Sequence, residues 1–485
     1  MENKKRNTEE TAFRRAFGIH LTSSKIFKDY IFPEIQDKLW QYKWIDLYAG
    51  EGNLIIPILN SIPLNDRIKF FNDHVFLSDI HPEMVEKCIE NVRNYGIPSE
   101  VALNNIKVRN NLENFPNFLK DEKLPLYHIT NPPYLYLGYI RKHKETQKYL
   151  KLFEGKNEGY QDLYQIAMIS DLRNNIQNLV YIIPSNFLFG ASVSNRFRGD
   201  FLKFYDIRKM FIFETKVFEF TGTNICIGFF EKKSIPKEEN VEFSGLKIEN
   251  QRKPKEMNYI LKPEFNYRAG SEFDEFLKEY QLKDTLKVKY YLLKKDLLVN
   301  SGGNKLDVID ANKYQNNQYK KLTIEVNNEF KETIQSNILY VRTVDTGSYD
   351  GRVGLGVISE DFNVNGIYVS GNTYRTHPIQ IFFEPTISLT EQNLLKNYFN
   401  FILETFRERL DSSFLTTYKY SNAEYTRKYL GLTQARKLIQ TYPYTNISLR
   451  LKEKLANFIR KKDFNGVLEQ LKTCKKESNQ SEIRT

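Results

Sequence analysis

Short apolar runs alternate with longer helix-like segments over residues 41–233. Three of the runs, residues 44–48, 75–78 and 126–130, have the length and composition of buried strands. A Gly-x-Gly loop follows the first run, an aspartate follows the second, and two prolines follow the third. The alternation predicts a doubly wound α/β sheet, and such sheets bind ligands at the carboxyl ends of their strands.

The run 126–130 ends in Asn131-Pro132-Pro133-Tyr134. The prolines stop the strand and leave Asn131 and Tyr134 at its carboxyl edge. The Asn131 side-chain carbonyl and the Pro132 backbone carbonyl can accept both hydrogens of a planar NH2 group, because Pro133 has no N–H that competes. Two such acceptors pull the nitrogen toward tetrahedral geometry and free its lone pair for attack, while Tyr134 stacks on the ring. A proline-punctuated turn with an incidental asparagine is the alternative interpretation.

A nucleoside-binding pattern precedes this motif. Gly50 and Gly52 follow the first strand, and glycines allow a sharp turn that approaches a ligand closely. The helix start after them offers N–H groups to a carboxylate. Asp79 ends the second strand, twenty-seven residues after Gly52, where it suits ribose hydroxyls. The third glycine of the dinucleotide fingerprint is missing. This argues against a nicotinamide cofactor and for S-adenosylmethionine, a nucleoside with an amino-acid tail.

With these motifs the chain resembles the gamma-class N6-adenine DNA methyltransferases of type II restriction-modification systems. That family has the same order: a helical N-terminal motif, the glycine loop, Asn-Pro-Pro-Tyr, and a target-recognition domain. Further matches are Gly18–Ser23, Asp162–Tyr164, Ile183–Leu188, Arg198 with Leu202, and Val217, Phe218, Thr221, Thr223 and Ile225. The chain departs from the family at Ser23, which replaces a proline, in a longer connection over 60–74, and after the third strand. There Asn110 or Asn111 replaces an acid that contacts the cofactor adenine.

The resemblance implies methyl transfer from S-adenosylmethionine to N6 of an adenine flipped out of duplex DNA. The catalytic residues would be Asn131, Pro132, Pro133, Tyr134 and Phe218, with Tyr134 and Phe218 sandwiching the base. The cofactor would lie along Thr22, Asp46, Gly50, Gly52, Asp79 and Asn110. No metal is required, because the sulfonium is already a good leaving group. The chain would be the modification component of a restriction-modification system whose endonuclease is encoded separately.

The resemblance also implies the fold and the domain order. The fold class is α/β, with a Rossmann-like methyltransferase domain of seven strands followed by an α+β target-recognition domain. We expect a helical N-terminal region over 1–40, the catalytic domain over 41–233, a polar linker over 234–240, the target-recognition domain over 241–475, and a disordered tail over 476–485. A large second domain is needed because adenine N6 cannot be reached inside a duplex, so one domain holds the DNA while the base swings out.

The net charge is +11, and the excess of basic residues lies near the C-terminus. Residues 401–485 carry 17 basic and 9 acidic side chains, interleaved with aromatic ones. This mixture suits phosphate contact beside base or sugar stacking. We therefore expect DNA contacts from Tyr418, Lys419, Tyr420, Arg427 and Lys428. Solvated faces of amphipathic helices are the alternative, above all for residues 448–477.

Cysteine usage and hydropathy indicate the compartment. The three cysteines, Cys88, Cys226 and Cys474, are too few and too scattered for a disulfide framework or a metal site. None follows a proline, so the nucleophile of cytosine-C5 methyltransferases is absent. The N-terminus has no apolar core, and no run approaches the length of about eighteen residues that a membrane span needs. We expect a cytoplasmic monomer without membrane contact.

Three other functions are compatible with parts of the sequence. Asn-Pro-Pro-Tyr also occurs in methyltransferases that act on protein glutamine or on guanine N2 of RNA, although these usually lack a large C-terminal domain. A fused restriction endonuclease would need an Asp followed by Glu-x-Lys, and no convincing example stands outside the methyltransferase motifs. A DNA-binding module without catalysis is the third alternative, and the intact motifs argue against it.

Overall fold

The computed structural model describes residues 22–218, 221–250, 252–283, 285–345, 351–373, 377–444 and 448–481. Most of the first predicted motif, residues 18–21, lies outside these ranges. The chain forms two compact units. The first contains Met1–Ala269 and Thr417–Thr426, and the second contains Gly270–Thr416 and Arg427–Thr485.

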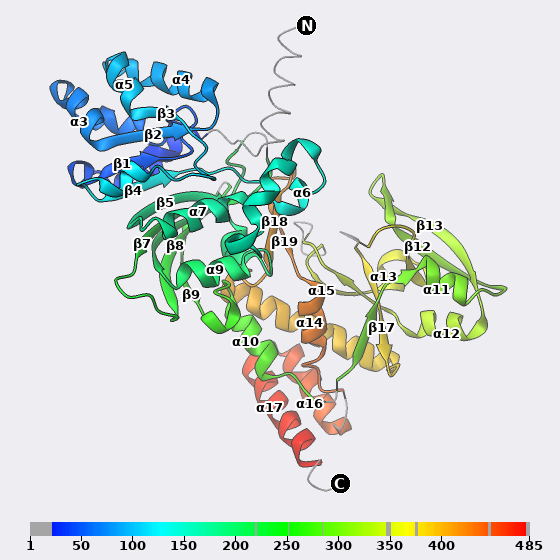
Figure 1. The fold of residues 1–485 in the computed structure, drawn as a ribbon. Helices are drawn as coiled ribbons and strands as arrows, with labels where there is room; N and C mark the ends of the chain where they lie inside the picture. Colours follow the sequence, from blue (N-terminus) through cyan, green and yellow to red (C-terminus); the bar gives the residue numbers. More distant parts are fainter. Residues whose placement is uncertain are drawn as a thin grey trace. The chain divides into compact units, whose positions relative to one another are not determined.

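A nine-stranded sheet forms the centre of the first unit (Figure 1). Its strands are β1 (Lys43–Asp46), β2 (Val75–Asp79), β3 (Ile106–Val108), β4 (Leu126–Thr130), β5 (Asn178–Pro184), β6 (Tyr205–Glu214), β7 (Ile225–Lys232), β8 (Val241–Glu249) and β9 (Lys255–Leu261). Their order is β3-β2-β1-β4-β5-β7-β6-β8-β9. Strands β1 to β5 pair in parallel, and β7 is antiparallel to both neighbours. The α/β fold predicted from the sequence is confirmed, and its sheet has two more strands than the seven expected.

Helices flank this sheet and cover its strands. They are α2 (Ser24–Ile26), α3 (Arg67–His74), α4 (Pro82–Arg93), α5 (Ser99–Asn105), α6 (Leu137–Ile140), α7 (Leu163–Arg173), α8 (Asn186–Phe189) and α9 (Asn195–Leu202). Helices α3, α4 and α5 pack beside β1, β2 and β3 (Figure 1). Helix α4 begins at Pro82, where a missing N–H costs nothing, and buries Met84, Val85, Cys88 and Val92 on one face. Every residue of β1 and β2 is buried, as is β5 after Asn178, so both faces of the sheet are covered at these strands.

The boundary between the units differs from the predicted linker at 234–240. Strand β8 pairs in parallel with β6, and β9 pairs antiparallel with β8, so both extend the first sheet. The polar, proline-containing segment therefore connects β7 to β8 inside the first unit, and the chain divides after Ala269. Residues 241–269 thus belong with the predicted catalytic domain.

The second unit contains two four-stranded sheets, in the orders β10-β17-β14-β15 and β11-β16-β12-β13. Their strands are β10 (Lys287–Tyr290), β11 (Leu292–Leu293), β12 (Asn304–Gln315), β13 (Gln318–Val326), β14 (Leu339–Arg342), β15 (Gly354–Val357), β16 (Gly366–Val369) and β17 (Ile379–Glu384). The helices are α10 (Ser271–Glu279), α11 (Lys294–Val299), α12 (Asn328–Ser336), α13 (Ile358–Phe362), α14 (Leu389–Leu410), α15 (Leu432–Ile439), α16 (Leu449–Arg460) and α17 (Phe464–Ser481). A two-stranded hairpin, β18 (Thr416–Tyr420) and β19 (Thr426–Tyr429), lies between α14 and α15 in sequence.

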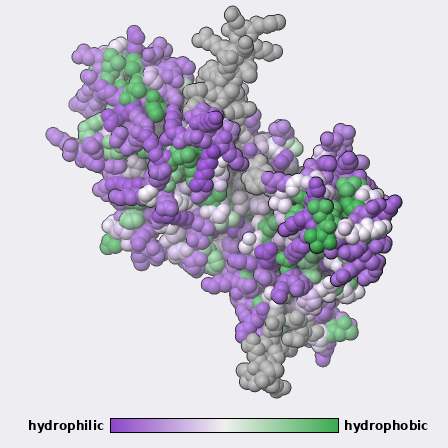
Figure 2. Space-filling view, turned by 45° about the vertical axis from the view of Figure 1, so that its right-hand side comes forward, coloured by the Kyte–Doolittle hydropathy of each residue, from purple (hydrophilic) through white to green (hydrophobic). Residues whose placement is uncertain are grey.

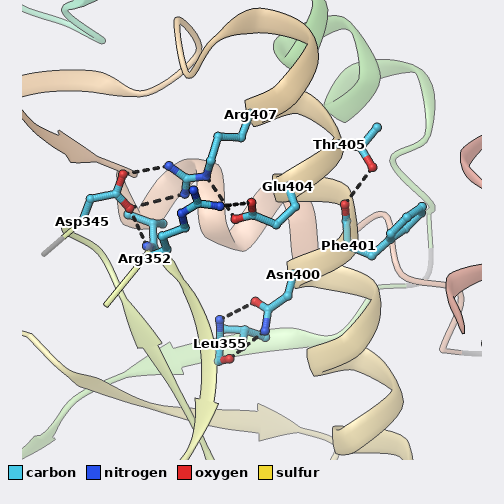
Figure 3. Close-up of polar contacts among 9 residues, drawn as sticks. Asp345, Arg352, Leu355, Asn400, Phe401, Glu404, Thr405 and Arg407 are labelled. Atoms are coloured by element: carbon cyan, nitrogen blue, oxygen red, sulfur yellow. Dashed lines mark hydrogen bonds and ion pairs between the residues drawn. The ribbon is translucent and has the colours of Figure 1, made fainter. Parts of the chain in front are cut away.

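Helix α14 is joined to the first of these sheets by polar contacts, which Figure 3 shows. Arg407 donates to both oxygens of Asp345, at 2.7 and 3.3 Å, and also to Glu404 at 3.1 Å. Asn400 pairs with the backbone N–H and carbonyl of Leu355 in β15, at 2.8 and 2.9 Å. The last helix, α17, continues to Ser481 and so includes part of the tail that we expected to be disordered from residue 476.

Hydrophilic residues cover most of the molecular face drawn in Figure 2. Among the residues that the structure describes, no helix has the length and apolar character of a membrane span. All three cysteines are buried, and none of them forms a disulfide. Within the same residues, no three His, Cys, Asp or Glu side chains are grouped as a metal site would need.

Candidate cofactor and acceptor site

A pocket lies in the first unit, at the carboxyl ends of β1, β2, β3 and β4. This is the edge at which ligands of open α/β sheets bind. Its wall includes most of the predicted cofactor residues, Thr22, Asp46, Gly50, Asp79 and Asn110, together with Asn131 and Pro133 of the second motif. The two motifs therefore face one cavity, although about eighty residues separate them in the sequence.

The glycine loop has the conformation that the sequence predicts. Gly50 and Gly52 have φ values of 53° and 84°, in the left-handed region that favours glycine. Gly50 lines the pocket, whereas Gly52 packs inward. A methyl group on Gly52 would lie 2.3 Å from the Ile56 side chain and 2.9 Å from the Cys88 sulfur. Gly52 therefore allows the loop to pack against α4, while Gly50 allows the backbone to approach a ligand.

Asp79 both orders this loop and lines the pocket. One carboxylate oxygen accepts the Gly50 N–H at 2.9 Å, and the other accepts the His81 N–H at 2.9 Å. Burial raises the pKa of Asp79, and these two N–H donors oppose that rise. Each carboxylate oxygen can accept more than one hydrogen bond, so a ribose diol can bind without breaking the loop contacts.

Asp46 is a buried acid at the end of β1. Its Oδ1 accepts the Thr130 hydroxyl at 2.6 Å and the Tyr48 N–H at 3.0 Å. Burial raises the pKa of Asp46 to about 6. The contact with Thr130 fixes the end of β1 against the end of β4, so Asp46 positions the two strands that carry the two motifs.

Three polar residues follow the third strand, β3, at the pocket. Asn110 lines the cavity, on the side where the sequence predicts a contact with the cofactor adenine. Asn111 is buried and donates to the Leu47 carbonyl at 2.5 Å and to the Ser78 hydroxyl at 3.0 Å, so its amino group supports the strand ends. Arg109 also lines the pocket, and its buried Nε has no hydrogen-bond partner among the residues described. Arg109 was not predicted, and its place directly after β3 is the signal that could have identified it. Other lining residues that were not predicted are Tyr48, Glu51, Asn53, Leu54, Ile80, His81, Met84, Leu112 and Tyr149.

Asn131 is held at both ends of its side-chain amide. The amino group donates to the Thr22 hydroxyl at 2.8 Å, and the carbonyl accepts the Tyr134 hydroxyl. The same hydroxyl also lies 2.7 Å from the Ile182 carbonyl in β5. A carboxamide oxygen can accept two hydrogen bonds in all, so the Tyr134 contact is compatible with an amine acceptor. Pro132 is buried, and Pro133 reaches the pocket.

Tyr134 and Phe218, the two rings expected to sandwich the base, lie beside each other. Their ring centroids are 6.4 Å apart and their planes are inclined by 55°. Both rings are buried, with 8% and 4% of their surface exposed. A flat base between two rings needs a separation of about 7 Å, twice the contact distance of carbon atoms. The observed spacing is shorter and is that of two rings in direct contact, so the rings must move apart and rotate before a base can lie between them.

A buried hydrogen-bond network holds β4 in place. The His128 Nε2 accepts the Leu47 N–H at 3.1 Å, so the proton on Nδ1 is donated to Asp171 at 2.6 Å. The Tyr181 hydroxyl donates to the same Asp171 oxygen at 2.6 Å. His128 is three residues before Asn131, and this network fixes the strand that carries it. His128 was not predicted from the sequence, where its only signal is a polar residue inside an apolar run.

Asp162 is another buried acid, and it contacts the backbone next to the Asn-Pro-Pro-Tyr motif. Asp162 accepts the Leu135 N–H at 3.0 Å, directly after Tyr134. Burial raises the pKa of Asp162 to about 7. Asp162, which belongs to the predicted Asp-Leu-Tyr match, therefore holds the backbone directly after the Asn-Pro-Pro-Tyr motif.

The predicted DNA contacts lie on the β18–β19 hairpin. Lys419 and Arg427 are exposed, and Tyr418 and Tyr420 are half-buried. Lys428 is only 6% exposed, so it is not placed for contact with a phosphate. In β19 alternate residues face opposite sides, and the sequence alone could not tell which of Arg427 and Lys428 faces solvent.

Residues 68–218 match the family of Eco57I restriction-modification methylases. No curated protein matches the sequence. The chain is similar to the Type IIL restriction-modification enzyme MmeI, solved in complex with DNA, with 12% identity and a TM-score of 0.54 over 96% of this chain and 76% of that one. It is also similar to a modification subunit of a putative type I restriction enzyme from Vibrio vulnificus YJ016, with 15% identity and a TM-score of 0.36 over 72% of this chain and 61% of that one. For DrdV, solved in a DNA complex, identity is 12% and the TM-score 0.39, over 55% of this chain and 32% of that one.

These comparisons confirm the resemblance to restriction-modification methylases that the sequence motifs predicted. The family match covers the strand that ends at Asp79, the Asn-Pro-Pro-Tyr motif and Phe218, and it begins after the glycine loop. The likeness to MmeI, at 12% identity, concerns the fold. The chain spans about a third of DrdV and less than two thirds of the Vibrio vulnificus subunit.

Proposed function

We propose that the chain transfers a methyl group from S-adenosylmethionine to N6 of an adenine in duplex DNA, as the modification enzyme of a restriction-modification system. One observation carries this proposal: Asn131 lines the same pocket as Asp79 and Gly50. The clamp expected for an aromatic amine and the acid expected for a ribose thus face one cavity. Direct transfer between two bound molecules requires this proximity.

The pocket fits S-adenosylmethionine, which supplies an electrophilic methyl group on a sulfonium. Asp79 accepts the ribose hydroxyls, and Gly50 allows the backbone to approach the amino-acid tail. Asn110 and Arg109 lie after β3, at the side expected for the adenine. Thr22 lines the pocket, and its hydroxyl accepts a hydrogen bond from Asn131 of the amine clamp. The position of Thr22 supports a role for the N-terminal motif in bringing cofactor and acceptor together.

The acceptor amine is oriented by the Asn131 and Pro132 carbonyls. The Asn131 side-chain carbonyl accepts the Tyr134 hydroxyl and keeps a second acceptor site for the amine. Hydrogen bonds from an NH2 to these carbonyls strengthen as positive charge develops on the nitrogen, so they favour the transition state over the ground state. The extra proton of the product amine is acidic enough to leave to water.

Tyr134 and Phe218 hold the base on its two faces after it leaves the duplex. Base stacking on an aromatic side chain is worth about 1–3 kcal/mol per base in comparable sites. The second unit would select the DNA sequence, and a separately encoded endonuclease would cut unmodified sites. The likeness to MmeI, which was solved in complex with DNA, supports DNA as the substrate class.

Incubation of the full chain with radiolabelled S-adenosylmethionine and separate DNA, RNA and protein acceptors tests the proposal. We expect label in double-stranded DNA, recovered as N6-methyladenine after digestion. Asn131→Ala should reduce transfer by more than about a hundredfold while cofactor binding changes little. The control is Asn104→Ala, which removes an exposed amide on α5.

Label in RNA or protein alone would assign the site to one of the alternative acceptors. Near-normal transfer by Asn131→Ala would remove the amine clamp on which the proposal stands. Absence of transfer to any acceptor, with normal cofactor binding, would favour a DNA-binding module.

A further inference from the structure

Residues Thr417–Thr426 form the hairpin tip, which contains most of β18 and the turn to β19. Although α14 and α15, the helices that flank the hairpin in sequence, belong to the second unit, the hairpin tip belongs to the first. Its backbone meets the connection between β6 and β7 directly: the Tyr420 N–H donates to the Gly222 carbonyl at 2.8 Å. A methyl group on Gly222 would lie 2.8 Å from the Tyr420 carbonyl oxygen, so only glycine allows this approach.

Asn224 makes the second link between the hairpin tip and the sheet. Its side-chain amino group donates to the Thr426 hydroxyl at 2.8 Å and to the Phe213 carbonyl at 3.1 Å. Its backbone carbonyl accepts the Ser185 N–H at 2.8 Å. Asn224 is 3% exposed, so these bonds form away from water. One side chain therefore joins the hairpin tip to the end of β6, and its backbone holds the loop after β5.

The linked segment is the one that carries Phe218. Gly222 and Asn224 lie in the connection between β6 and β7, four and six residues after Phe218. A shift of the hairpin tip would therefore move the connection that holds the ring expected to stack on the acceptor base.

The junction also contains unsatisfied polar groups. The Asn224 Oδ1, the Thr417 hydroxyl and the Ser421 hydroxyl are buried without a hydrogen-bond partner among the residues described. Buried polar groups are almost always paired in folded proteins. Three such atoms in and beside one small hairpin leave the junction with hydrogen-bonding capacity that a shifted hairpin tip can use.

We propose that the hairpin tip couples DNA contact to the acceptor-base site, with Asn224 as the positioning residue that links them. The inference rests on the proposed function. Lys419, exposed on β18, supplies a cation for a phosphate at the hairpin tip. Contact there shifts the hairpin tip, and the bonds from Gly222 and Asn224 carry the shift to the segment after Phe218. The base site then forms when DNA is engaged.

The test uses the full chain and a duplex that carries fluorescent 2-aminopurine in place of the target adenine, at the site found by mapping methylated positions in a host that expresses the chain. Thr426→Val removes the hydroxyl that accepts from Asn224 and preserves the shape. It should lower both the fluorescence gain at saturating DNA and kcat by about threefold to tenfold, as expected for one buried hydrogen bond. The KM for S-adenosylmethionine should stay within about twofold. Thr426→Ser should restore both quantities, and Asn422→Ala, exposed in the same turn, is the control.

Gly222→Ala provides a second variant, because its added methyl displaces the Tyr420 carbonyl. It should reproduce the loss of fluorescence and of kcat. If the wild type methylates DNA and both variants match it in fluorescence and kcat, the coupling is wrong and the proposed function stands. If both variants lose cofactor affinity as strongly as kcat, the junction is merely structural and the inference is overturned. If the wild type methylates no DNA, the proposed function and this inference fail together.

Discussion

The Thr22 hydroxyl accepts a hydrogen bond of 2.8 Å from the Asn131 side-chain amide, although 109 positions separate the two residues. The Tyr134 hydroxyl donates to the other end of the same amide. These two contacts place the carbonyl on the Tyr134 side of the amide and the amino group on the Thr22 side. An amine clamp needs this fixed orientation, because only the carbonyl can accept a hydrogen from an NH2 group.

The first prediction tests the orientation of that amide. Thr22→Val should lower kcat at saturating S-adenosylmethionine by about threefold to tenfold, because one neutral hydrogen bond is lost. Thr22→Ser keeps the hydroxyl and is the matched control. Single-turnover methylation rates measure the effect. An unchanged rate for Thr22→Val would mean that the Tyr134 contact alone orients the amide.

Asp79→Ala should weaken the cofactor and not the DNA. The variant loses a charged hydrogen-bond acceptor that also orders Gly50, so we expect a loss of about 1–3 kcal/mol in binding free energy for S-adenosylmethionine. Titration calorimetry measures the cofactor affinity, and gel shift in the absence of cofactor measures the DNA affinity. Equal losses in both would indicate that Asp79 supports the fold and not the ligand.

Truncation tests the boundary between the two units. A fragment that ends at Ala269 should melt at a higher temperature and aggregate less than one that ends at Pro236. The shorter fragment removes β8 and leaves the edge of β6 unpaired, and unpaired edges promote association. Thermal melting with light scattering compares the two. Equal behaviour would mean that β8 and β9 add nothing to the stability of the first sheet.

The strands beside the pocket could be predicted because their signals are local. Residues 126–130 were predicted as a strand that the prolines stop, and β4 is Leu126–Thr130. Similarly, the run that ends at Asp79 is β2, Val75–Asp79. In both, burial on two faces favours a mostly apolar run, and the pocket is reached by Asp79 at the end of β2 and by Asn131 directly after β4.

Features that depend on distant pairing could not be predicted. The segment 234–240 has the same polar composition whether it joins two strands of one sheet or two domains, and only the pairing of β8 with β6 decides between them. Likewise, the interleaved charges of 418–428 do not reveal that Lys428 is buried. The contact of Asn131 with Thr22 also joins segments that no local pattern relates.

Asp162 predicts a pH dependence of stability. Burial raises the pKa of Asp162 from its ordinary value of 3.8 to about 7. The folded chain therefore binds the proton more tightly than the unfolded chain, so stability is present below the unfolded pKa and is lost as the pH rises toward the folded pKa. Asp162→Asn keeps an oxygen for the Leu135 N–H but has no titrating group.

Relative to the wild type, Asp162→Asn should gain stability as the pH rises from about 4 to about 8. Urea denaturation at several pH values measures the difference between the two unfolding free energies. The contributions of other buried acids, such as Asp46, are common to both proteins and cancel. A constant difference across this range would show that the Asp162 carboxyl titrates alike in the folded and unfolded states.

The last prediction concerns extrusion of the base, which the proposed function requires. Flipping costs a few kcal/mol of stacking and pairing, and a mismatch opposite the target adenine removes part of that cost. A duplex with such a mismatch should therefore bind more tightly than the matched site, because the contacts to the flanking bases are unchanged.

Phe218→Ala should weaken the capture of the base by about 1–3 kcal/mol, the range for base stacking on an aromatic side chain. Phe218→Leu keeps an apolar side chain without a ring, so it separates stacking from burial. Competition binding with matched and mismatched duplexes measures these differences. Equal affinity for the two duplexes would argue that the acceptor is not drawn from a duplex, and the Asn131 clamp would then serve an amine in RNA or protein.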